Sequence, residues 1–154
     1  MSDDKLVIRV ATESDLPAVF KLMSELGYPD LPVERFQRTY SSVWKHPAMT
    51  LFIAEADGVA VGLASVSRRP QLRLAADLIT IDELVVADHA RGLGVGRALL
   101  THVKTIAQSA GVGRLELETS RSRESYRRQF YIKNSFTEAD SAVMRIDFDP
   151  ADDS

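Results

Sequence analysis

A glycine-rich turn between a strand-like run and a helix-like run is the feature that most constrains this chain. The stretch RGLGVGR, residues 91–97, follows ITIDELVV and precedes ALLTHVKTIAQSA. Glycine loses more conformational entropy on folding than other residues, and inside a helix it costs up to ~1 kcal/mol relative to alanine. Glycines at 92, 94 and 96 therefore indicate that something approaches the backbone closely. Because the first turn of a helix has unpaired N–H groups, a phosphate suits it; a purely structural turn is the alternative.

Apolar periodicity along the rest of the chain predicts a single domain over residues 1–154, with an ordered core of about 5–148 and an acidic tail at 149–154. Strand–helix–strand order in the second half implies parallel pairing there, since a helical crossover returns the chain in the same direction. A basic loop carrying Pro70 is expected at 68–76. Strands are expected at 5–11, 50–56, 59–67, 77–86, 114–120 and 141–148, and helices at 12–26, 32–46, 95–110 and 123–134.

Composition excludes several classes of function. Acidic residues outnumber basic ones by 22 to 19, so no overall attraction to nucleic acid or to an anionic membrane is expected. No apolar run is long enough to span a membrane, and the N-terminus lacks a signal-peptide pattern. Cysteine is absent and the three histidines are scattered, so we expect no metal site and a cytoplasmic location.

Two familiar phosphate loops do not fit the turn. A dinucleotide fingerprint needs glycine at its first, third and sixth positions, but the sixth position from Gly92 is Arg97. A P-loop needs Gly-Lys followed by Ser or Thr, which the turn lacks. The pattern Arg91-x-x-Gly94-x-Gly96, after ELVV and before an amphipathic helix, instead resembles the pyrophosphate signature of the GNAT superfamily of acyl-CoA-dependent N-acetyltransferases. FYIKNSF, residues 130–136, resembles the second signature of that family.

The resemblance covers nearly the whole chain and implies an α/β (α+β) GNAT fold, with a mixed sheet of about six to seven strands flanked by about four helices. It implies acetyl-CoA as the acetyl donor, with no metal. The pantetheine arm would lie between two splayed parallel strands, near residues 84–86 and 115–119. The residues implied to bind the cofactor are Leu84, Val85, Val86, Arg91, Gly92, Leu93, Gly94, Val95, Gly96, Arg97 and Tyr131.

The second signature departs from the family pattern at three positions. Glu124 stands where many members have asparagine, Arg127 where they have a small alanine, and Ser135 where they have glycine. The missing asparagine removes one polar contact expected to the cofactor arm. Four arginines are candidates to reach the CoA phosphates instead, or they form a solvated helix face: Arg121, Arg123, Arg127 and Arg128.

Two adjacent carboxylates, Asp82 and Glu83, interrupt an otherwise apolar strand. An alkyl ammonium has a pKa near ~10, so acetylating it requires a group that removes a proton. Burial raises the pKa of a carboxyl and makes it a base, although a solvent-facing or structurally paired carboxylate is the alternative. Strand alternation predicts that the two point to opposite faces. Asp82 falls near the position where some family members keep a glutamate base, and Glu83 is within the reach of a strand bulge.

The resemblance also implies the remaining chemistry, which is direct attack through a tetrahedral intermediate. The backbone N–H of Val86 would stabilise the oxyanion, and Tyr131 would protonate the departing thiolate. Packing beside Phe130 is the alternative role for Tyr131. His89, in the turn, is expected on the surface.

The sequence thus predicts an N-acetyltransferase acting on a primary amine of a small molecule or peptide. A non-catalytic acyl-CoA-binding or interaction module with the same fold is the alternative. The resemblance implies that residues 26–44 and 68–76 shape the acceptor site, where Arg68, Arg69 and Arg73 would favour an acidic acceptor or simply be solvated. The acceptor, the use of longer acyl-CoAs and homodimer formation stay open.

Overall fold

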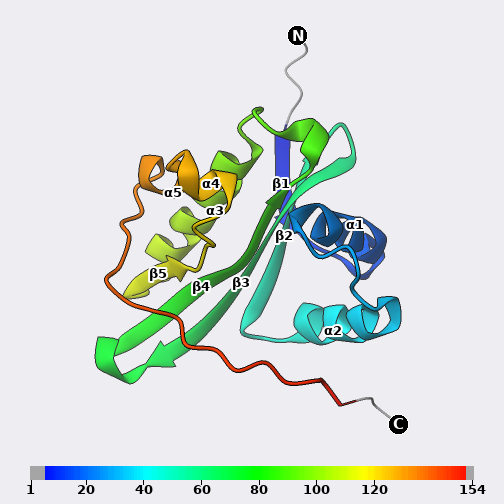
Figure 1. Ribbon diagram of the computed structural model, residues 1–154. Helices are drawn as coiled ribbons and strands as arrows, with labels where there is room; N and C mark the ends of the chain where they lie inside the picture. Colours follow the sequence, from blue (N-terminus) through cyan, green and yellow to red (C-terminus); the bar gives the residue numbers. More distant parts are fainter. Residues whose placement is uncertain (1–5, 152–154) are drawn as a thin grey trace. The chain divides into compact units, whose positions relative to one another are not determined.

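The computed structural model describes residues 6–151 and divides into two compact units, with the boundary between Thr119 and Ser120. The first unit contains a five-stranded mixed sheet in the order β1-β2-β3-β4-β5 (Figure 1). Its first four strands pair antiparallel, and β4 pairs parallel with β5, as the strand–helix–strand order predicted. The strands are β1 Leu6–Val10, β2 Met49–Ala56, β3 Val59–Gln71, β4 Ala76–Val86 and β5 Arg114–Leu117.

Two reversals make the central hairpins of this sheet. Asp57 and Gly58 join β2 to β3 with positive φ angles of 52° and 76°, and Asp-Gly is a residue pair typical of such hairpin turns. The loop expected at 68–76 is wrong, because β3 continues to Gln71 and pairs with β4 up to Ala76. Pro70 is tolerated near the end of the strand, where one missing donor costs little. A 3₁₀ turn, Leu72–Leu74, makes the reversal.

Three helices cover the two faces of the sheet, with α1 and α2 on one side and α3 on the other (Figure 1). A Cβ added to Gly62 in β3 would lie 2.8 Å from Val95 and 3.1 Å from Leu99, so residue 62 faces α3. Side chains alternate along a strand, so Leu63 and Ser65 face α1 and α2. The helices are α1 Leu16–Leu26, α2 Val33–Lys45 and α3 Val95–Ser109.

The core of the first unit lies between the sheet and these helices. Its largest fully buried side chains are Ile53, Leu63 and Leu78 of the sheet and Leu99, Leu100 and Val103 of α3.

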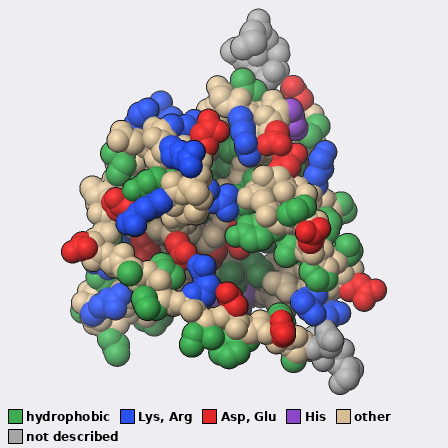
Figure 2. All heavy atoms as spheres, viewed as in Figure 1, with side chains coloured by type: hydrophobic (Ala, Val, Ile, Leu, Met, Phe, Trp, Pro, Cys, Tyr) green, Lys and Arg blue, Asp and Glu red, His purple; other side chains and the backbone are tan. Residues whose placement is uncertain are grey.

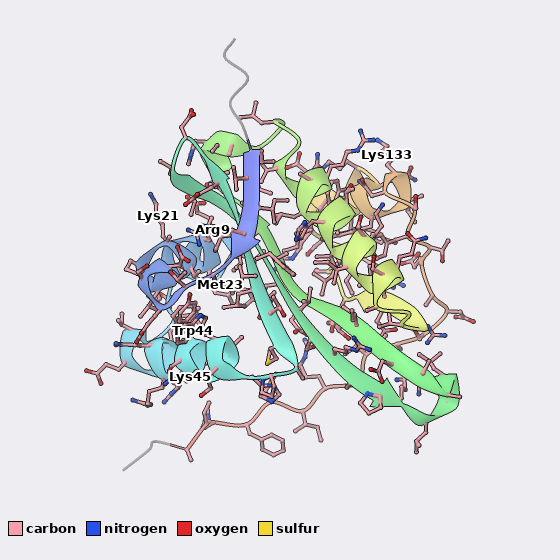
Figure 3. The ribbon with its side chains drawn as sticks, turned by 180° about the vertical axis from the view of Figure 1, so that it is seen from behind. Arg9, Lys21, Met23, Trp44, Lys45 and Lys133 are labelled. Atoms are coloured by element: carbon pink, nitrogen blue, oxygen red, sulfur yellow. The ribbon has the colours of Figure 1, made fainter. Side chains whose placement is uncertain are left out.

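Polar contacts fix the N-terminal connection. Thr12 and Asp15 have the sequence spacing of a helix capping box, and the backbone N–H of Thr12 donates to the Asp15 carboxylate at 2.7 Å, as such a box requires. The Arg9 guanidinium donates to both carboxylate oxygens of Asp15, at 2.7 and 2.8 Å, and to Glu55 at 2.9 Å (Figure 3 shows Arg9). On α2, the Tyr40 hydroxyl donates to the Thr12 carbonyl at 2.6 Å and the Trp44 indole to the Ala11 carbonyl at 3.1 Å.

The second unit contains two short helices, α4 Glu124–Arg127 and α5 Phe130–Lys133. A single helix at 123–134 is therefore wrong, because Gln129 takes a left-handed conformation, φ 58°, and breaks it. The strand expected at 141–148 is also wrong, since no residue there pairs with another strand. The sheet therefore has five strands rather than six to seven, and the described part of the chain has five α-helices rather than four.

Candidate active site

The first two glycines of the turn adopt a backbone conformation that favours glycine. Gly92 and Gly94 have φ angles of 80° and 81°, in the left-handed region that residues with a Cβ rarely adopt. A Cβ added to either glycine would meet nothing within 4 Å, so the space beside the turn is open. The turn therefore leaves its backbone accessible.

Gly94 also caps α3. The first bond of this helix runs from the Ala98 N–H to the Gly94 carbonyl, at 3.0 Å, so the amides of Val95, Gly96 and Arg97 have no acceptor within the helix. These three N–H groups stand at the positive end of the helix dipole and suit an anion.

The side chains around the turn differ in their exposure to solvent. Val95 is buried, so only its backbone is available to a ligand. Leu93 and Arg97 are exposed, and Arg91 pairs with Asp88 at 3.0 Å. Side chains of both signs lie on the face that Figure 2 shows.

The parallel pair β4–β5 separates just before this turn. Its last registered partners are Ile81 and Leu117, and Leu84, Val85 and Val86 continue along β4 without a partner in β5. The N–H of Ala87 donates to the Val61 carbonyl on β3 at 2.8 Å. Because successive N–H groups alternate between the two edges of a strand, that of Val86 points to the β5 side, where β5 has ended.

A β-bulge brings Asp82 and Glu83 to the same face of the sheet. Ser65 lies opposite Glu83 and Val66 lies opposite Ile81, so Asp82 is the extra residue. Glu83 accepts a hydrogen bond from Ser65, and the Ser67 hydroxyl lies near enough to Asp82 to lower the pKa of its carboxyl. These serines are two residues apart and share a face. The expectation of opposite faces is therefore wrong, because the bulge resets the alternation.

The two carboxylates differ in environment. Glu83 is half-buried, and its desolvation raises the pKa of the carboxyl; the Ser65 hydroxyl lowers this pKa and the charge of Asp82 raises it. Asp82 is exposed, and partial desolvation raises its pKa while the Ser67 hydroxyl opposes the rise. Glu83 is thus the better shielded base.

Sequence reasoning missed the two serines. Their signal was present, since Ser65 and Ser67 interrupt the apolar run VAVGLASVS at alternate positions. Only the register of the hairpin shows that they lie opposite the acidic pair.

Tyr131 lies in the second unit, where its ring packs edge-on against Phe130 at 5.1 Å and against Phe136 at 6.1 Å between centroids. The expected packing beside Phe130 is confirmed, and the role in catalysis stays a prediction. Burial raises the pKa of Tyr131, while a hydrogen bond with Ser125 and the charges of Arg123 and Arg128 lower it.

Ser135, which stands where glycine was expected from the family resemblance, has a backbone conformation that glycine adopts more readily. Its φ of 76° is left-handed, and the N–H of the next residue, Phe136, donates to the Tyr131 carbonyl at 3.0 Å to close α5.

The four candidate arginines include Arg121 and Arg128, which make contacts within the second unit. Arg121 pairs with Glu138 at 3.4 Å, and the guanidinium of Arg128 lies 5.0 Å from the centroid of the Phe130 ring. Contact of any of the four with a phosphate stays a prediction.

The remaining expectations concern histidines, metals and membranes. His89 is exposed in a 3₁₀ turn, as predicted, whereas the His102 ring packs edge-on against Phe52 at 4.9 Å. Within residues 6–151, no group of three metal-binding side chains comes together. None of the helices in that range has the length and apolar character to cross a membrane.

Comparison with known proteins adds the family. The acetyltransferase (GNAT) family matches residues 16–136. The aminoalkylphosphonate N-acetyltransferase of Salmonella typhimurium is 29% identical over 132 residues, covering 86% of this chain and 85% of that protein. A transcriptional regulator from Bacillus halodurans C-125 matches with a TM-score of 0.82 and 25% identity, covering 94% of this chain and 100% of the other. An aminoglycoside N-acetyltransferase solved in complex with CoA has the same fold, with a TM-score of 0.79, 20% identity and coverage of 93% and 95%.

Proposed function

This chain belongs to the acetyltransferase (GNAT) family, and from that premise we propose that it transfers acetyl from acetyl-CoA to the primary amine of a small molecule. The observation that carries the proposal is the position of Glu83. This half-buried carboxylate lies two residues beyond Ile81, the last residue of β4 paired with β5, on the strand that leads into the open glycine turn. One segment of the chain thus carries a candidate base, then the part of β4 that has no partner in β5, and then the turn that suits an anion.

The turn suits the pyrophosphate of acetyl-CoA, because Gly92 and Gly94 leave its backbone open and three amides start α3 without helical acceptors. In this proposal the pantetheine arm runs along the edge of β4 that β5 leaves at Leu117. Val85 is buried, so its contribution, like that of Val95, is through the backbone.

Acetyl-CoA supplies a thioester whose carbonyl carbon the neutral amine attacks. Glu83 accepts the proton that the acceptor ammonium must lose, since only the free amine carries a lone pair. The Val86 N–H stabilises the negative charge that develops on the carbonyl oxygen. Tyr131 donates its phenolic proton to the sulfur as the C–S bond breaks. The nitrogen sheds a second proton as it becomes the amide, and that proton restores the Tyr131 phenol. The acceptor ammonium thus loses two protons, one to Glu83 and one that replaces the proton given to CoA, which leaves as the thiol.

The acceptor is proposed only by class. The name of the Salmonella relative makes an aminoalkylphosphonate the first amine to test. The three arginines considered for an acidic acceptor, Arg68, Arg69 and Arg73, are all exposed, and Arg68 pairs with Asp77 at 2.7 Å. Amino acids, polyamines, aminoglycosides and peptide N-termini complete the panel.

The test combines calorimetry with a thiol-release assay over this amine panel. Binding of acetyl-CoA together with amine-dependent release of CoA supports the proposal. Binding without turnover by any amine supports the alternative, a non-catalytic acyl-CoA-binding module. Absence of binding contradicts both.

A further inference from the structure

We propose that Ser65 is a positioning residue, whose hydroxyl holds the Glu83 carboxylate in one orientation at the bulge of β4. The inference rests on the proposed function, because it needs Glu83 to act as the base. It adds a residue on β3 that shares no sequence segment with either family signature.

The contacts of Ser65 converge on a single residue. Its Oγ accepts a hydrogen bond from the backbone N–H of Glu83 at 3.0 Å and donates one to the Glu83 carboxylate oxygen Oε2. One hydroxyl therefore holds both the backbone and the side chain of Glu83. A hydroxyl has one proton to give, and here it goes to the carboxylate.

The burial of Ser65 argues that the contact is built into the fold. Ser65 is 2% exposed, and within residues 6–151 only one other polar residue, Asp15, is buried. Burying a hydroxyl is unfavourable unless it is hydrogen-bonded. Asp15 is satisfied by the Arg9 ion pair and the helix cap, which are structural contacts. Ser65 is satisfied by Glu83.

The bulge provides a matched pair for comparison. Ser65 is hydrogen-bonded to half-buried Glu83, whereas the Ser67 hydroxyl acts on exposed Asp82. The two serines share a strand and a face, and they differ in which carboxylate they serve. Ser67→Ala shows the effect of losing any serine hydroxyl on this face. An additional effect in Ser65→Ala is then due to the lost hydrogen bond to Glu83.

The direction of the effect follows from the charges around Glu83. Asp82 is the neighbouring charge that raises the pKa of Glu83, and the Ser65 hydroxyl lowers it. On α1, which packs on β4, Glu25 accepts a hydrogen bond from the Asp88 N–H at 3.3 Å and Lys21 is exposed (Figure 3).

The two neighbouring strands also carry charges. Arg68 on β3 pairs with Asp77, and Glu116 on β5 lies opposite Thr80 in the register. None of these groups replaces a lost donor at Oε2, so removing the Ser65 hydroxyl raises the pKa of Glu83. The acidic limb of the kcat profile then moves to higher pH.

The experiment measures kcat and KM for acetyl-CoA from pH 5 to 9 in Ser65→Ala, Ser67→Ala and wild type. Because a carboxylate that loses one hydrogen-bond donor binds its proton roughly tenfold more tightly, we expect the acidic limb of Ser65→Ala to lie about 1 pH unit higher. Its kcat below the limb should fall about tenfold with KM unchanged. Ser67→Ala should leave the limb in place, and Ser65→Thr, which keeps a hydroxyl, should restore it.

A second measurement, an NMR titration, tests the contact between Ser65 and Glu83 without requiring enzyme turnover. The side-chain carboxyl ¹³C signal of Glu83, assigned with Glu83→Gln, is titrated in wild type, Ser65→Ala and Ser67→Ala, with thermal unfolding confirming that each is folded. A higher titration midpoint in Ser65→Ala alone supports the contact even if no amine is turned over, in which case the proposed function fails by itself. Equal titrations in the two alanine variants, or equal kcat profiles, overturn the role of Ser65.

Discussion

Replacing Gly94 with alanine should weaken acetyl-CoA binding by more than its effect on stability explains. The left-handed φ of 81° costs a residue with a Cβ about 1 kcal/mol or more. The added Cβ meets nothing within 4 Å, so no steric clash adds to this cost. For a chain of this size about 1 kcal/mol lowers Tm by roughly 2–4 °C, and the variant should stay folded.

Gly111, beyond the other end of α3, provides the matched control. Its φ is 68°, and a Cβ there also meets nothing within 4 Å, so Gly111→Ala should show a similar loss of stability. Only Gly94 precedes the amides proposed to bind pyrophosphate. Misplacing one hydrogen bond to a charged group weakens binding roughly tenfold or more.

The assay is calorimetric titration of acetyl-CoA into both variants and wild type, alongside their thermal unfolding. We expect similar Tm values for the two variants, and a raised Kd for Gly94→Ala alone. Equal Kd values in two folded variants would refute the assignment of the turn to phosphate binding.

Three other perturbations are expected to give distinct results. The Arg9 guanidinium holds the pKa of Asp15 down to about 2, so this pair contributes about 2 kcal/mol at neutral pH that is lost as pH falls from about 4 to 2. Urea unfolding in that window should be less pH-dependent in Asp15→Asn. Ser135→Gly should raise stability by about 0.5–1 kcal/mol in urea unfolding, because it relieves the left-handed φ; an unchanged midpoint would argue against strain there. Tyr131→Phe keeps the ring and should lower turnover ~10–100-fold with unchanged acetyl-CoA affinity, whereas unchanged turnover with chemistry rate-limiting would leave Tyr131 a packing residue.

Local signals along the chain predicted most of the sheet. The Asp57-Gly58 turn, the capping residues Thr12 and Asp15, and the strand–helix–strand order each depend on neighbouring residues, so they can be read from one sequence. The glycines of the turn were recognised for the same reason, and the structure adds their left-handed φ angles. These features depend little on the rest of the fold.

Two of the failures depend on pairing between distant segments, and a third is a local helix break. Nothing in DELVV shows that Asp82 bulges, because a bulge is defined by the register against β3. The alternation of 141–148 is that of a strand, but Val143, Met144, Ile146 and Phe148 are exposed and the segment has no strand partner. The helix break at Gln129 is not signalled by glycine or proline, which are the usual marks.

The carboxylate pair tests the central claim most directly. Acetyl transfer is measured at saturating acetyl-CoA across pH for Glu83→Gln and Asp82→Asn, with wild type alongside. We expect Glu83→Gln to lose ~10²–10⁴-fold in kcat, the usual contribution of a positioned base. Asp82→Asn should stay within several-fold, with its acidic limb moved to lower pH, because the charge of Asp82 raises the pKa of Glu83. A wild-type profile in Glu83→Gln, or a larger loss in Asp82→Asn, would contradict Glu83 as the base.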